Sequence, residues 1–157
     1  MGLYEMLNKE INIYTDASNV LNLNLCKISI IIKGFYDEER ITEFYDGKIN
    51  QGELNAVLKS FDFIKNKYHK LVGYKINIYS DHQANVKFLN TILNKSYNNS
   101  NKKKIKFERA MNRKNLELDD LKKINEISNE NEVNINWIPR KNNKEADKLS
   151  KYKKENQ

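Results

Sequence analysis

The alternation of hydrophobic and polar residues predicts three β-strands in the first third of the chain. Residues 11–16 alternate with a period of two, the repeat of a strand that is buried on one face. Residues 25–33 form a β-branched run, which favours a central buried strand. A weaker strand is expected at about 40–45, after a turn marked by Gly34 and acidic residues. The short connections between these strands predict an antiparallel meander.

Beyond residue 50 the hydrophobic residues recur at spacings of three and four, which indicates an amphipathic helix. Helices and single strands then alternate, and Pro139 ends the last strand. A meander followed by strands separated by helices predicts an α/β domain with a mixed five-stranded sheet and helices on its faces. The expected elements are a helix over about 51–68, a strand over 75–80, a helix over 83–93, a helix from about 116, a strand over about 133–137 and a helix over about 143–152.

Residues 94–115 lack a clear hydrophobic period, and we expect a basic loop there. The stretch is the most basic part of the chain, which suits contact with phosphate groups or a solvated surface equally well. Its cationic residues are Lys102, Lys103, Lys104, Lys106, Arg109, Arg113 and Lys114.

The length and charge of the chain indicate one domain with a polyanionic partner or a strongly solvated surface. A chain of 157 residues is expected to form a single domain over 1–157, with a core over about 11–152. The formal net charge of +7 favours nucleic acid among polyanions, although charge alone identifies no site. The single cysteine, Cys26, excludes an internal disulfide and a multi-cysteine zinc site. It lies in an apolar run and is expected in the core.

We expect no association with a membrane. The longest apolar run, residues 28–32, is far too short to cross a bilayer. The first residues, Met1 to Glu5, lack the basic and apolar regions of a signal peptide. These features predict an intracellular, cytoplasmic protein.

Four carboxylates stand where the chain changes its local character. Asp16 and Asp81 follow two closely similar runs, Ile-Asn-Ile-Tyr-Thr and Ile-Asn-Ile-Tyr-Ser. Glu53 and Asp147 lie in the first turns of two predicted helices. Each acid alone is more often a surface charge or a helix cap. Together, at strand ends and helix starts, they predict a convergent cluster that needs a cation, and hydrolysis of a phosphodiester by two Mg²⁺ ions requires such a cluster.

The residues around these acids resemble the type 1 ribonuclease H family. Four segments carry the resemblance, and the last is the most specific: Tyr14–Ser18, Glu53–Ala56, Ile78–Asp81 and Trp137–Ser150. The order Asp, Glu, Asp, Asp on a βββαβαβα frame also agrees with the family. The resemblance implies a ribonuclease H-like fold over nearly the whole chain.

The resemblance also implies a function and a division of roles. It implies an endonuclease that cuts the RNA strand of RNA–DNA hybrids with two Mg²⁺ or Mn²⁺ ions, leaving 5′-phosphate and 3′-hydroxyl ends. Asp16 would bridge both ions, and Glu53 and Asp81 would complete the ion on the leaving-group side. Asp147 would hold the ion that activates water. The family precedent is a monomer.

Further site residues are implied less directly. Many family members have a histidine in the loop before the last acid, where this chain has Arg140, which can contact a phosphate but cannot act as a base. The basic stretch lies where some members carry a substrate-binding protrusion. The residues expected to contact substrate are Ser18, Asn19, Gln51, Asn143, Lys102, Lys103 and Lys104.

Two alternatives remain open at the level of sequence. One is a non-catalytic nucleic-acid-binding module that keeps the fold, although the presence of all four acids argues against it. The other is a nuclease of the same fold that acts on a different nucleic acid.

Overall fold

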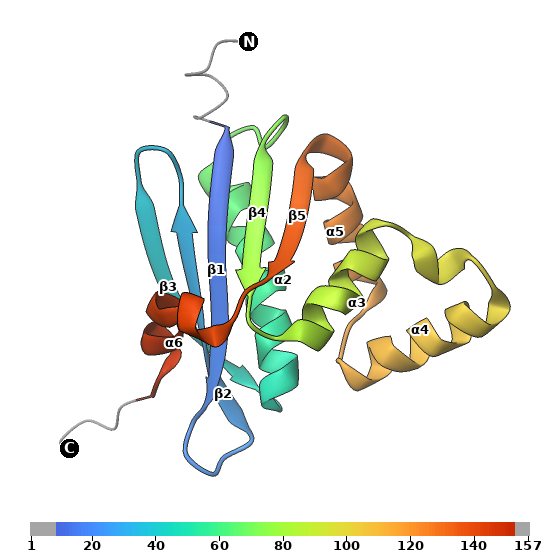
Figure 1. The fold of residues 1–157 in the computed structure, drawn as a ribbon, viewed down its shortest axis with the longest axis horizontal. Helices are drawn as coiled ribbons and strands as arrows, with labels where there is room; N and C mark the ends of the chain where they lie inside the picture. The colour runs from blue at the N-terminus through green and yellow to red at the C-terminus, as the bar shows by residue number, and fades with distance from the viewer. Residues whose placement is uncertain (1–8, 153–157) are drawn as a thin grey trace.

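A mixed five-stranded sheet forms the centre of the molecule (Figure 1). The structure is a computed structural model and describes residues 9–152. The strand order is β3-β2-β1-β4-β5, in which β1–β2 and β2–β3 are antiparallel and β1–β4 and β4–β5 are parallel. The predicted meander and mixed sheet are therefore confirmed. The strands are β1 (Glu10–Asn19), β2 (Leu25–Lys33), β3 (Glu38–Asp46), β4 (Lys75–Ser80) and β5 (Glu132–Trp137).

Helices lie on both faces of this sheet. Helices α2, α3 and α5 pack together on one face, whereas α6 lies on the opposite face against β1 and β2 (Figure 1). The helices are α2 (Ile49–Lys67), α3 (Gln83–Leu93), α4 (Asn101–Arg113), α5 (Leu118–Glu130) and α6 (Lys144–Ser150), with 3₁₀ turns η1 (Ser96–Asn98) and η2 (Arg140–Asn142).

The core lies between the sheet and α2. Isoleucines of β1, β2 and β4 meet Leu54, Val57, Phe61 and Ile64 of α2, and these four are almost completely buried. Each such side chain stabilises the fold by about 1.5–3 kcal/mol. Because α2 and α6 contact β2 from opposite faces, its apolar run is buried almost continuously. Cys26 is buried in β2, as predicted.

The basic stretch is largely helical, so the prediction of a loop over 94–115 is wrong. Helix α4 occupies residues 101–113 and extends away from the sheet (Figure 1). The Ser100 hydroxyl caps it by accepting a hydrogen bond from the Lys103 amide at 3.2 Å. Phe107, Ala110 and Met111, at helical spacing, bury its inner face. Only a few apolar residues stand among the lysines of this stretch, so the helical period is weak in the sequence.

Two boundaries also differ from expectation. Strand β1 continues past Asp16 to Asn19, because Ser18 and Asn19 still pair with Lys27 and Cys26 of β2. Asp16 therefore lies inside a strand and not at its end. Strand β3 begins at Glu38, within the acidic stretch that was predicted to be a turn.

Over residues 9–152, no helix is long and apolar enough to cross a membrane. The prediction about the first five residues lies outside the part of the chain that the structure describes.

Candidate active site

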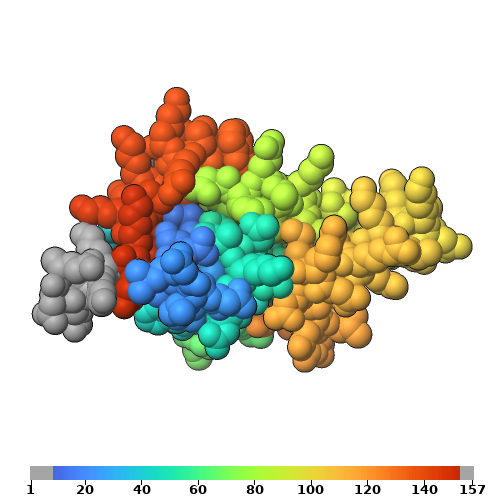
Figure 2. Space-filling view, turned by 90° about the horizontal axis from the view of Figure 1, so that it is seen from below, coloured from blue at the N-terminus to red at the C-terminus, as the bar shows by residue number. Residues whose placement is uncertain are grey.

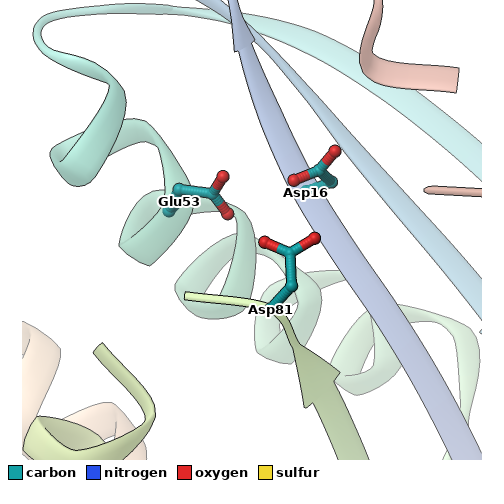
Figure 3. Close-up of side chains that lie close together, drawn as sticks. All are labelled: Asp16, Glu53 and Asp81. Atoms are coloured by element: carbon teal, nitrogen blue, oxygen red, sulfur yellow. The ribbon is translucent and has the colours of Figure 1, made fainter. Parts of the chain in front are cut away.

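Three of the four predicted acids converge at one edge of the sheet (Figure 3). The parallel pairing of β1 with β4 sets Tyr14 opposite Tyr79, so that Asp16, two residues on in β1, and Asp81, the residue after β4, lie at the same end of the two strands. Glu53 approaches from α2. One carboxylate oxygen of each acid lies within 4.8 Å of the corresponding oxygens of the other two.

A glycine allows the helix that carries Glu53 to come this close. Gly52 faces β1 and β2, and a Cβ atom at this position would lie 3.1 Å from Cys26 Cβ and 3.6 Å from Ala17 Cβ. Any larger residue would push the first turns of α2 away from the sheet. Gly52 therefore helps to place the Glu53 carboxylate beside Asp16.

The fourth acid, Asp147, stands beside this close group. Its Oδ1 accepts a hydrogen bond from Arg140 Nη2 at 3.0 Å, and its Oδ2 lies 3.5 Å from Lys151 Nζ. Its helix α6 is held to the sheet by Ser29, whose hydroxyl donates to the Ala146 carbonyl at 2.7 Å. Ser150, one turn after Asp147, donates to Asp16 at 3.1 Å. All four predicted acids thus gather at one site, with Asp147 on its α6 side.

Burial makes the two innermost carboxylates hard to ionise. Burial raises the pKa of Asp16 to about 6, with a further rise from the charge of Asp81. Burial raises the pKa of Glu53 to about 10, and the neighbouring Asp16 and Asp81 charges add to the effect. The Glu53 Oε2 atom is buried and has no hydrogen-bond partner among residues 9–152. A divalent cation fits this donor set, because it would pair with the orphaned oxygen and offset the repulsion among the acids.

These shifts predict how the metal-free protein responds to pH. A carboxyl whose pKa is raised by folding stabilises the native state below its unfolded pKa, and this stabilisation is lost as the pH rises toward its folded pKa. In EDTA, the wild type should therefore lose stability relative to Glu53→Gln between about pH 5 and pH 9, by up to about 1.4 kcal/mol per pH unit. Urea unfolding of both proteins across this range measures the difference. A difference that stays constant with pH would contradict the raised pKa.

The pKa of Asp147 is shifted in the opposite direction to those of Asp16 and Glu53. Partial burial opposes its ionisation, but hydrogen bonds from Arg140 and Asp16 and the charges of Arg140 and Lys151 hold its pKa below the ordinary value. Asp147 in turn raises the pKa of Arg140. The Arg140 side chain is 72% exposed and lines the same pocket as the three close acids. A guanidinium in this place can reach a phosphate group that enters the pocket.

The position of Asp81 is fixed by two neighbours. Asn143 Nδ2 donates to the Thr15 carbonyl at 2.9 Å and to Asp81 Oδ2 at 3.3 Å. The indole of Trp137 donates to the Asp81 carbonyl at 3.2 Å. Asn143 is 2% exposed, and its amide group holds Thr15 and Asp81 in place.

The other residues expected to contact substrate fall into two groups. Ser18 and Asn19 line the pocket of about 360 Å³ that also contains Asp16, Glu53 and Asp81. The Gln51 side chain is engaged elsewhere: it caps α2 by accepting from the Lys48 amide and donates to the Arg113 carbonyl at 3.1 Å. Lys102, Lys103 and Lys104 are exposed on the first turns of α4.

Three contacts of the site were not anticipated from the sequence: those of Ser150, Trp137 and Lys151 with the acids. Ser150 follows Asp147 at a spacing of three, which is the one sequence signal that these two share a helical face. Nothing in the sequence indicates that the Ser150 hydroxyl would reach Asp16 on a different element.

A comparison with models of protein families shows to which family the chain belongs. The model of the RNase H family matches residues 8–155, almost the whole chain. The chain belongs to the RNase H family. It is a hydrolase of the ribonuclease H class, a family that generally uses divalent metal ions, and the three close carboxylates agree with that chemistry.

Solved structures show the same fold. LC11-RNase H1, isolated from compost by a metagenomic approach, is 20% identical, with a TM-score of 0.54 over 90% of this chain and 92% of that one. The same enzyme in complex with an RNA/DNA hybrid is 19% identical, with a TM-score of 0.58 over 88% and 92%. RNase H1 from the archaeon Halobacterium salinarum NRC-1 is 16% identical, with a TM-score of 0.56 over 90% and 94%. A search of curated proteins gave no match.

Proposed function

We propose that this ribonuclease H hydrolyses the RNA strand of RNA–DNA hybrids, with two Mg²⁺ ions held by Asp16, Glu53, Asp81 and Asp147. The observation that carries the proposal is the set of three carboxylates whose oxygens lie within 4.8 Å of one another, with one buried oxygen of Glu53 that no described residue pairs. The hybrid-bound structure of LC11-RNase H1 supports this choice of substrate.

The four acids would bind different metal ions in the site. Divalent ions in such a site activate a water molecule and stabilise the leaving oxygen of a phosphodiester. Asp16 interacts with each of the other three acids and would bridge two ions, with Glu53 and Asp81 on the leaving-group side and Asp147 on the water side. Hydrolysis breaks the P–O3′ bond and leaves a 3′-hydroxyl and a 5′-phosphate.

Contacts with the substrate would come from both sides of the acids. Ser18 and Asn19 line the pocket, and RNA is distinguished from DNA through its 2′-hydroxyl groups. A basic stripe on α4 borders a groove of about 700 Å³ and is suited to backbone phosphates. Figure 2 shows α4, the β1–β2 hairpin and α6 reaching the same face of the molecule. The basic stripe comprises Lys102, Lys106, Arg109 and Arg113.

The proposed role of Arg140 leads to a prediction of moderate size. Arg140→Ala should lower kcat for hybrid cleavage about tenfold, because a hydrogen bond to a charged group contributes about 1.5–3 kcal/mol. Arg140→Lys should recover part of the loss. Lys141→Ala, the neighbouring exposed cation on η2, is the matched control and should keep wild-type turnover. Equal rates for Arg140→Ala and Lys141→Ala would make Arg140 a surface residue.

One assay tests the proposed function. The protein is incubated with labelled RNA–DNA hybrid, double-stranded RNA and duplex DNA, each in Mg²⁺, Mn²⁺ or EDTA. Metal-dependent cleavage of the hybrid alone is the expected result. Binding without cleavage in either metal would instead favour a non-catalytic module, and cleavage of another substrate would favour a nuclease of different specificity.

A further inference from the structure

A cluster of serine hydroxyls joins the catalytic strand β1 to helix α6. Ser150, the last residue of α6, is completely buried. Its Oγ lies 3.1 Å from Asp16 Oδ2, 2.9 Å from the Asp147 carbonyl oxygen and 2.8 Å from Ser18 Oγ. The hydroxyl thus lies between one predicted metal ligand, the backbone of another, and a residue that lines the pocket.

The number of protons that the serine hydroxyls can donate restricts which hydrogen bonds of this cluster can form together. A serine hydroxyl has one proton to donate, and a carbonyl oxygen or an ionised carboxylate can only accept. A carboxylate that binds a metal ion carries no proton. When Asp16 holds a cation, the Ser150 proton therefore satisfies one of three acceptors: Asp16, the Asp147 carbonyl or the Ser18 hydroxyl.

The ionised carboxylate is the strongest acceptor of the three. Hydrogen bonds to ionised groups are roughly twice as strong as neutral ones. Asp16 is 4% exposed, so few other donors can reach it. The Asp147 carbonyl lies in the last turn of a helix, where carbonyl groups commonly turn to water. Ser18 then donates to Ser150, and the order of donation runs from Ser18 to Ser150 to Asp16.

We propose that Ser150 is a positioning residue for Asp16: its hydroxyl, held in turn by Ser18, fixes the carboxylate in the orientation that binds the metal. The inference rests on the proposed function, because it concerns the same metal site. Figure 3 shows the two oxygens of Asp16 pointing in different directions, so one carboxylate can accept a hydroxyl and hold a cation at once. Hydrogen-bonded partners of ligating carboxylates typically change metal affinity 10–100-fold when removed.

Ser29 supplies a matched control. It is also completely buried, it lies opposite Asp16 in the β1–β2 register, and its hydroxyl also anchors α6, through the Ala146 carbonyl at 2.7 Å. It has no hydrogen bond to a carboxylate in the part of the chain that the structure describes. Ser29→Ala therefore removes an anchor of α6 without removing a donor to the metal site.

The test is a titration of Mn²⁺ into the full chain without substrate, followed by the electron paramagnetic resonance signal of free Mn²⁺. Ser150→Ala should bind Mn²⁺ about tenfold more weakly than the wild type, and Ser29→Ala should bind it as the wild type does. Both variants should lose thermal stability to a similar degree. Equal Mn²⁺ affinities for the two alanine variants would overturn the proposal.

A second Ser150 variant and a cleavage assay of the wild type separate the possible outcomes of this test. Ser150→Cys fills the position with a slightly larger thiol that donates only weakly, so it should also bind Mn²⁺ more weakly, and it carries the test if Ser150→Ala does not fold. Hybrid cleavage by the wild type separates the two proposals. Wild-type cleavage with unaltered Mn²⁺ affinity in the Ser150 variants would overturn the positioning role alone. Weakened Mn²⁺ binding in those variants, with no cleavage by the wild type, would support the positioning role and overturn the proposed function.

Discussion

Replacing Asp16 by asparagine is expected to lower the rate of hybrid cleavage by about 1000-fold or more. Asp16 interacts with each of the other three acids, and loss of its charge would weaken both proposed metal positions, each of which would supply several kcal/mol to the reaction. Single-turnover cleavage of a labelled hybrid in Mg²⁺, with enzyme in excess, measures the change without a contribution from product release.

The same substitution should stabilise the metal-free protein. Burial raises the pKa of Asp16 to about 6, so its ionised form destabilises the native state at pH 8. Asp16→Asn should therefore melt at a higher temperature than the wild type in EDTA, and the order should reverse in saturating Mg²⁺. Asp119 is an exposed acid in the first turn of α5, and Asp119→Asn is the control. It should change neither the rate of hybrid cleavage nor the melting temperature. Near-normal cleavage by Asp16→Asn would refute the assigned site.

Neutralising the basic stripe of α4 should have the second large effect. Exchange of Lys102, Lys106, Arg109 and Arg113 for glutamine should weaken hybrid binding at least about 100-fold at low salt. It should also reduce the slope of log K against log salt by about three to four, since each phosphate contact contributes about 0.9. The rate of cleavage in the saturated complex should change little, because no side chain of the stripe lines the pocket that contains the acids.

A second set of lysines controls for net charge. Four exposed lysines lie at the end of the sheet and of α2 away from the acids, and their replacement by glutamine removes the same charge. This variant should keep most of the wild-type salt slope. If both sets reduce the slope equally, the hybrid senses only the total charge of the protein and α4 is not a specific contact. The control residues are Lys9, Lys65, Lys70 and Lys75.

The core of the site could be predicted because two similar runs of sequence became neighbouring strands. Ile11, Asn12, Ile13 and Tyr14 pair with Ile76, Asn77, Ile78 and Tyr79 residue for residue. The acid that follows each run therefore reaches the same edge of the sheet. The periodic spacing on α2 likewise placed Glu53 near the start of a helix that packs on this sheet.

Other features depend on tertiary contacts that local patterns do not encode. Helix α4 shows few apolar residues, and it folds because Phe107 stacks between Tyr97 and Phe88 of neighbouring elements. Asn143 was expected to contact substrate, but the path of η2 buries it against Thr15 and Asp81. Gln51 caps its helix and holds the end of α4, two functions that require the neighbouring chain to be in place.

The most direct test compares wild type and Asp16→Asn, purified in parallel, on one hybrid whose RNA strand is labelled, in Mg²⁺ and in EDTA. The proposed function predicts that the wild type in Mg²⁺ cuts the RNA strand to products with 5′-phosphate and 3′-hydroxyl ends. It also predicts no cleavage in EDTA, and cleavage by the variant in Mg²⁺ that is about 1000-fold or more slower than that of the wild type. Cleavage of the RNA strand that persists in EDTA, or that Asp16→Asn carries out at the wild-type rate, would contradict it.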